Sequence, residues 1–378
     1  MLKGVHLTLL VGPAVPVPVP RSVLDELTSV EVTSQDEGVS GFSLSFTLSN
    51  SSILPTLFMV AGGSPLPIVR VIVVVTVNGT PNVLADGVVT KTQVLPGTDA
   101  AHSTLQVIGE DLTVLMDKIE LTGLPYPAMP GEAIAAVILA KYAVLGVVPL
   151  IIPSILLDVP IPTDRIPVQK GTDLEYLQYL VNRVGYVFYL EPGPEPGLTT
   201  AYWGPKIKVG VPQPALNVNM DAYANVEQLT FSFDSQSRSL PVIFIQDEET
   251  KAPIPIPIPD ISPLNPPLGL VQPAPSKFRS LPETAKYTPT QAVLLGMAEA
   301  SKSADTVTGT GSLDVLRYGR LLKARQLVGV RGAGIAFDGL YYVTQVKHSI
   351  KPGEYKQTFT LKRNALITNT PVVPTLPY

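Results

Sequence analysis

The stretch TDLEYLQYLVNRVGYVFYL, at Thr172–Leu190, predicts a short amphipathic helix that runs directly into an aromatic strand. Thr172 and Glu175 have the spacing of a capping box, in which two side chains satisfy backbone N–H groups of the first turn. Gly185 offers the left-handed conformation that ends a helix, and the apolar period then changes from 3.6 to 2. The pattern indicates packing and contains no catalytic group. We assign structural roles here to Thr172, Leu174, Glu175, Leu177, Val181, Gly185, Tyr186 and Phe188.

The composition predicts two or three domains with few charges on the surface. Of 378 residues, 45% are hydrophobic and only 15% are charged, against roughly 25% charged in an average soluble protein. Such a chain has a large core or hides much surface in contacts with other chains. The net charge of −4 and the lack of a basic run argue against a nucleic-acid partner. The absence of cysteine excludes disulfides and thiolate sites, and fits a reducing cytoplasm.

Two apolar segments allow a choice between membrane and core. The N-terminal MLKGVHLTLLVGPAVPVPVP is a signal peptide or a first strand leading into a proline-rich arm, and we favour the strand because His6 and Thr8 interrupt the apolar run. Ala133–Leu157 is long enough to span a membrane. It carries Lys141 near its middle and two prolines, so we expect a buried helix of about 12–15 residues followed by an extended connection. We therefore expect no stable membrane insertion.

The remaining pattern is mainly β with helical insertions. GFSLSFTL at Gly41–Leu48 alternates apolar and polar residues, which predicts a strand with one buried face. Val71–Val77 is almost continuously apolar, as in a strand covered on both faces. Ala252–Pro275 is so rich in proline that we expect an extended, polyproline-like segment, either a disordered linker or an ordered arm on a neighbouring chain. Further strands are expected at Glu31–Ser34, Gly87–Thr92, Tyr186–Leu190, Leu198–Trp203, Val226–Phe233 and Pro241–Ile245.

Helical spacing appears in three further places. Leu112, Leu115, Met116 and Ile119 would share one helix face. Two more helices are expected at Thr290–Ser303 and Leu313–Leu327, and the charges of the second are interpreted as a solvated face. The chain closes with a predicted hairpin of Gly339–Ile350 and Tyr355–Arg363, in which Tyr355, Gln357, Phe359 and Leu361 face one way.

No group of residues has the pattern of a catalytic, metal or cofactor site. His6, His102 and His348 lack metal-ligand spacing. Gly329–Gly334 follows a helix pattern and precedes a strand pattern, the reverse of the order in a dinucleotide site, and Ser40 lacks the context of a nucleophile elbow. A carboxylate pair for glycan hydrolysis could come from Asp158, Asp164, Asp173 and Glu175, and a sugar-stacking surface from Tyr186, Tyr189, Tyr202 and Trp203. We expect neither, and no enzyme activity.

Two segments carry a resemblance to a known family. They are TDLEYLQYLVNRVGYVFY, at Thr172–Tyr189, and GLYYVTQVKHSIKPGEYKQTFTLKRN, at Gly339–Asn364. With RYGRLL and the opening VPRSVLDELTSVEVT, they resemble the baseplate hub proteins of contractile phage tails, the late control D or tail protein D family. The same module forms the N-terminal part of type VI secretion spike proteins. The resemblance covers roughly Val19–Asn364.

The resemblance implies an α+β, mainly β fold with two related β-barrel-like hub domains and helical insertions. Three chains would form a pseudo-six-fold ring that adapts a six-fold inner tube to a three-fold spike. The expected parts are a first barrel-like domain at 1–110, a helical insert at 111–160, the first part of a second barrel-like domain at 161–250, a proline-rich arm with helices at 251–334, and the closing hairpin with the C-terminal tail at 335–378.

The implied partners are two further copies of the chain, the inner tube protein, a separate spike protein and other baseplate proteins. The expected location is a tail or injection-system particle assembled in the cytoplasm. Phage tail, tailocin and cellular injection system stay open as settings. The alternatives are another baseplate or tube-associated structural protein, or a tail-associated cell-wall hydrolase.

Overall fold

The computed structural model describes residues 4–13, 15–48, 54, 57–58, 68–96, 103–154, 156, 158–163, 165–246, 253–259, 265–281 and 289–369. Strands make up 47% of the structure and helices 18%, so the mainly β prediction is confirmed. His102 and Asp164 lie outside the described residues.

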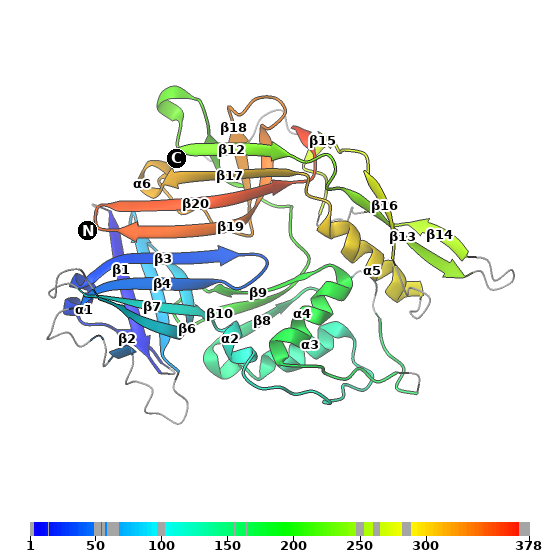
Figure 1. Cartoon of the computed structure of the whole chain (residues 1–378), viewed down its shortest axis with the longest axis horizontal. Coiled ribbons are helices and arrows are strands. Elements are labelled where there is room, and N and C mark those ends of the chain that lie inside the picture. The colour runs from blue at the N-terminus through cyan, green and yellow to red at the C-terminus, as the bar shows by residue number, and fades with distance from the viewer. Residues whose placement is uncertain are drawn as a thin grey trace.

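A large sheet of 13 strands forms the body of the molecule (Figure 1). Its order is β12-β17-β20-β19-β3-β4-β7-β6-β5-β1-β2. Beside this path, β18 pairs with β19, and β11 pairs with β18. Its first half contains β1 Val5–Gly12, β2 Val17–Pro18, β3 Leu27–Gln35, β4 Gly41–Leu48, β5 Arg70–Val77, β6 Thr80–Leu95 and β7 Ser103–Asp111. Its second half contains β11 Gln213–Asn217, β12 Gln228–Phe233, β17 Val307–Asp314, β18 Leu327–Arg331, β19 Gly339–Lys351 and β20 Glu354–Arg363.

The two halves are distant in sequence and meet where β3 pairs antiparallel with β19. The register runs from Gln35 opposite Gln345 to Val30 opposite Ile350. One hydrophobic core continues across this seam, from Val5 to Leu361. No closed barrel is found among the described strands, so the expected pair of barrels is not shown.

The strands that the sequence marks most clearly are found in place. Phe42, Leu44 and Phe46 of β4 are buried on one face, as their alternation predicts. Almost every residue of β5 is buried, because other parts of the chain cover both of its faces. The closing hairpin is confirmed as β19 and β20, with Tyr355, Gln357, Phe359 and Leu361 all in the interior.

A smaller α/β module is inserted between the halves and has a core of its own. Its sheet has the order β8-β10-β9, with β8 parallel to β10 and β9 antiparallel to it. In Figure 1 its helices lie below this sheet, beside the first half of the large sheet. Its elements are α2 Thr113–Met116, α3 Gly131–Ala140, β8 Val147–Ile151, α4 Asp173–Val184, β9 Val187–Pro192 and β10 Thr199–Gly204.

Three expectations for this region need correction. The helix through Leu112–Ile119 is a single turn, and Ile119 is 66% exposed. The apolar helix ends at Ala140, and a 3-10 turn then leads through Gly146, in the left-handed region, into β8. We also expected Tyr186–Leu190 to supply a strand of the second barrel, but β9 belongs to the small sheet because β10 pairs with it. No helix in the described ranges is long and apolar enough to cross a membrane.

A β arm projects from the second half (Figure 1). It consists of β14 Pro253–Pro257, β13 Ser239–Gln246 and β16 Lys277–Ser280, with α5 Pro289–Lys302 packed on it. Ala252–Pro275 was expected to be extended and polyproline-like; within it Pro253–Pro257 is extended and pairs with β13 as the edge strand β14. Ile258 donates its backbone N–H to the Pro241 carbonyl, in register with the ladder between β14 and β13. Because N–H groups along a strand point alternately to its two sides, Ile254 and Ile256 also direct their N–H groups toward β13. The prolines occupy the alternate positions, where an N–H would point away from the sheet. Proline is therefore compatible with this edge strand.

The predicted helix at Leu313–Leu327 is also wrong. Its start belongs to β17, only Val315–Tyr318 forms a helical turn (α6), and β18 begins at Leu327. The chain is further completed by α1 Arg21–Asp25, before β3, and by β15 Gly269–Val271, which pairs with β21 Leu366–Thr368.

Candidate functional site

The described residues contain no group of three or more His, Asp or Glu side chains that could hold a metal ion. His6 is exposed on β1, whereas His348 is buried on β19 and accepts or donates a hydrogen bond of 2.8 Å with the Tyr355 hydroxyl. Burial lowers the pKa of His348 to about 4. It is therefore a neutral core residue at neutral pH.

The carboxylates that we considered for catalysis have structural partners. Glu175 completes the capping box with Thr172, and both of its hydrogen bonds are present. Asp173 is 3% exposed and accepts hydrogen bonds from Lys141, Tyr142 and the side-chain amide of Gln169. This network ties the end of α3 to the start of α4. The sequence pattern did not predict any of the three partners of Asp173, because they lie in other segments of the chain.

The packing residues of α4 lie in the core of the inserted module. Leu177 and Val181 are buried, and Leu174 packs against the same core. Gly185 ends the helix at φ 69°. A Cβ at this position would lie 2.6 Å from the Cα of Ala298 in α5, so no side chain fits there. Tyr186 meets Trp203 edge to face, and Phe188 lies opposite Trp203 in the sheet.

A buried ion pair connects the inserted module to the large sheet, and we call this contact the module junction. Arg70 on β5 binds both carboxylate oxygens of Asp86 on β6, at 2.7 Å each. Thr199 of β10 donates to Asp86, and Arg70 donates to the backbone carbonyl of Gly197. Arg70 and Asp86 are 4% and 2% exposed. The signal was present in the sequence, because an isolated charge within a run such as IVRVIVVVTV needs a buried partner.

Two lysines hold the segment that leaves β10 against the large sheet. Lys206 contacts Asp36 at 2.9 Å and Glu37 at 2.6 Å, and Lys208 contacts Asp305 at 2.6 Å. Burial alone would raise the pKa of Asp305, but the Lys208 ammonium lowers it below its ordinary value. These contacts fix the direction in which the chain returns to the second half.

Arg325 occupies the seam between the halves, where we had expected a solvated charge. Its guanidinium lies 3.9 Å from the centroid of the Tyr189 ring and donates to the carbonyl of Gln35 and the hydroxyl of Ser40. It is 8% exposed. The inserted module, β3 and the second half therefore meet around one cation.

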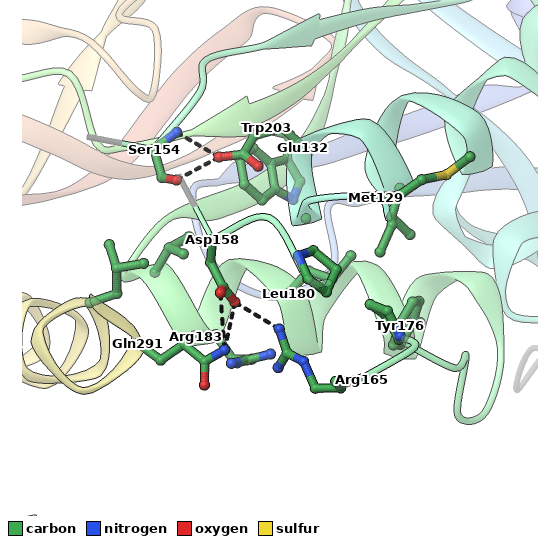
Figure 2. Close-up of a pocket in the computed structure, with 16 residues that line it drawn as sticks. Met129, Glu132, Ser154, Asp158, Arg165, Tyr176, Leu180, Arg183, Trp203 and Gln291 are labelled. Carbon is green, nitrogen blue, oxygen red and sulfur yellow. Dashed lines mark hydrogen bonds and ion pairs between the residues drawn. The ribbon is translucent and has the colours of Figure 1, made fainter. Parts of the chain in front are cut away.

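A pocket opens between α3, α4, β10 and α5 (Figure 2). Asp158 accepts hydrogen bonds from Gln291 and Arg165, and Glu132 accepts two from Ser154. The two acids therefore serve separate contacts rather than an acid/base pair.

The sheet edges differ in how they are protected. β2 has two residues, β14 presents prolines, and β16 carries Lys277 and Arg279. β12 is different: its sequence QLTFSF contains no charge and no proline, and no described strand pairs with its outer side. Edges of this kind accept a further strand.

The fold is that of phage tail proteins and of type VI secretion proteins related to them. A tail protein from Neisseria meningitidis matches with a TM-score of 0.62 at 15% identity, over 96% of this chain and 97% of that one. The 43 kDa tail protein of prophage MuSo2 from Shewanella oneidensis matches with a TM-score of 0.60 at 15% identity, over 95% and 98%.

A type VI secretion component of Escherichia coli, described as similar to the T4 tail proteins gp27 and gp5, matches with a TM-score of 0.53 at 13% identity, over 92% of this chain and 77% of that one. No protein-family model and no curated protein matches the sequence. The likeness therefore lies in the fold.

Proposed function

We propose that the chain is a structural baseplate hub subunit of a phage tail or contractile injection system. Three copies form a ring that joins a six-fold inner tube to a three-fold spike. The observation that carries the proposal is the match over nearly the full length of both chains with tail proteins.

The unprotected β12 edge supports ring formation by copies of the chain. A ring needs each subunit to offer a surface that its neighbour completes. β12 lies at the end of the large sheet, so a strand added there would extend the sheet into the next subunit (Figure 1). The low charged fraction of 15% also fits a protein with extensive subunit contacts.

The proposed ring is tested by light scattering on the purified full chain, followed by imaging of the particles. We expect a trimer with three-fold rings. Ser232→Lys places a charge beside the exposed β12 edge and should yield monomers. Ser22→Lys, on exposed α1, is the matched control and should leave the trimer intact. A wild-type chain that stays monomeric and adds to neither tube nor spike protein would refute the hub.

A tail-associated cell-wall hydrolase is the alternative function, and Asp158, which lines the pocket of Figure 2 beside Arg165, is the carboxylate on which it can be tested. A peptidoglycan-release assay on wild type and Asp158→Asn separates the two functions. We expect no release from either protein. Release that is lost in Asp158→Asn would favour the hydrolase.

A further inference from the structure

The projecting β arm has a helix on one of its two faces. α5 packs there, and Ala292 of the helix lies in a small core with Ile243 and Ile258. Side chains alternate along a strand, so the residues next to these two isoleucines point to the opposite face. We call this opposite face the arm face. It consists of Leu240 and Val242 of β13, Pro255 and Pro257 of β14, and Phe278 of β16, which the strand register places side by side.

The arm face is apolar and reaches solvent. Phe278 is 73% exposed, and the two prolines are also exposed, whereas the β13 residues are half-buried. The charged residues described in these strands, Lys277 and Arg279, alternate with Phe278 and therefore lie on the α5 face. Arg279 accordingly pairs with Glu299 of α5 at 2.5 Å. A sheet normally buries its apolar face against a second layer, so the arm face indicates a partner.

The arm face points away from the body of the molecule. α5 packs on the arm sheet and also approaches α4, where a Cβ on Gly185 would touch Ala298. The helix therefore lies between the arm sheet and the inserted module (Figure 1). A layer that covers the arm face has to come from outside the part of the chain that the structure describes.

The arm face is too small to hold a partner by itself. Three strands about 4.8 Å apart and about 16 Å long present a face of roughly 200 Å². A stable interface buries about 800 Å² on each partner. The molecule that covers the arm face must therefore be held to this chain by a second contact.

A suitable second contact lies next to the arm in sequence and in space. The open edge strand β12 ends at Phe233, and β13 begins at Ser239. The turn between them is held in place, because Asp234 donates its N–H to the Thr306 carbonyl and accepts the N–H of Gln236 on its side chain. A chain that pairs along β12 would therefore lie at the base of the arm (Figure 1).

We propose that the arm face is covered by the neighbouring copy of this chain that pairs along β12, so that the arm clamps the subunit contact. This inference rests on the proposed ring and adds the surface that secures it. Phe278 is the largest exposed side chain of the arm face, so its burial contributes most of the apolar area. The prolines add rigid apolar surface that loses little conformational entropy on binding.

The absence of cysteine allows a test on the full chain with a single introduced thiol. Phe278→Cys places the thiol on the arm face, and Lys277→Cys places it at the next position, on the α5 face. Both positions are exposed in the isolated subunit, so without a covering partner both thiols should react with a soluble disulfide reagent at similar rates. In the purified trimer, the thiol of Phe278→Cys should react at least tenfold more slowly than that of Lys277→Cys.

A second pair of variants measures how much the clamp contributes to assembly. Phe278→Ser should raise the concentration at which the trimer dissociates at least tenfold in light scattering, whereas Lys277→Ser should dissociate as wild type does. Thermal unfolding shows whether the variants are folded. The clamp is wrong, and the ring stands, if trimers form but the two thiols react at similar rates or folded Phe278→Ser dissociates as wild type does. A wild-type chain that stays monomeric would overturn both the ring and the clamp.

Discussion

The stability of the chain should fall as the pH is lowered from about 7 to about 5, and His348 should account for a defined part of the loss. Burial lowers the pKa of His348 from 6.5 to about 4. Its neighbours across the sheet, Val32 on β3 and Gln357 on β20, carry no charge that could compensate a proton. Between these two pKa values the unfolded chain binds a proton that the folded chain does not. His348 therefore lowers the free energy of unfolding by about 2 kcal/mol at pH 5, and by about 3 kcal/mol once the pH falls below 4.

The assay is urea unfolding at several pH values and one fixed protein concentration. His348→Gln removes the titrating ring and keeps a polar group near the Tyr355 hydroxyl. The variant should be less stable at neutral pH, but its free energy of unfolding should decrease by about 2 kcal/mol less than that of wild type between pH 7 and pH 5. His6→Gln, at an exposed position, should retain the wild-type pH dependence. Parallel pH profiles for wild type and His348→Gln would refute the assigned pKa shift.

Three further predictions concern the junction, the cap and the arm. Asp86→Asn removes the carboxylate from a buried ion pair and should cost about 3–5 kcal/mol in urea unfolding, whereas Glu31→Gln, in an exposed pair, should cost less than about 1 kcal/mol. A similar cost for both would show that burial does not govern the junction. Thr172→Ala should cost about 1 kcal/mol by removing the capping side chain, measured in the same way; an unchanged stability would contradict the cap. Pro255→Val restores an outward N–H on β14 and should cause concentration-dependent association in light scattering, while Ile254→Val, whose N–H already faces β13, should not.

The features that the sequence predicted correctly are local. The capping box at Thr172 and the alternation of Gly41–Leu48 each lie within a few residues of one another in sequence, so their physical causes can be read directly. The closing hairpin is equally local, because its two strands are joined by the short turn between Lys351 and Glu354.

The features that it missed depend on partners far away in sequence. No strand was predicted at the start of β17, where a Cβ at Gly309 would meet the Phe231 ring of β12 and one at Gly311 would meet the Gln228 carbonyl. Only the folded sheet shows that these glycines permit close strand packing. Arg325 was assigned to a solvated face for the same reason, because Tyr189 and Gln35 are brought to it by the seam. The candidate pocket was likewise beyond reach, since four separate elements form it.

The proline pattern connects the composition to the proposed assembly. With 39 prolines and only 15% charged residues, this chain has few charges with which to protect its strand edges. At β14 proline replaces charge, because every second residue lacks the N–H that would face a further strand. β2 is short and ends in Pro18, so it offers little to a partner. The β12 edge has neither protection, although it is the more exposed end of the large sheet's second half. When proline or shortness blocks the edge strands β14 and β2, pairing with a neighbouring subunit becomes specific for the open edge at β12.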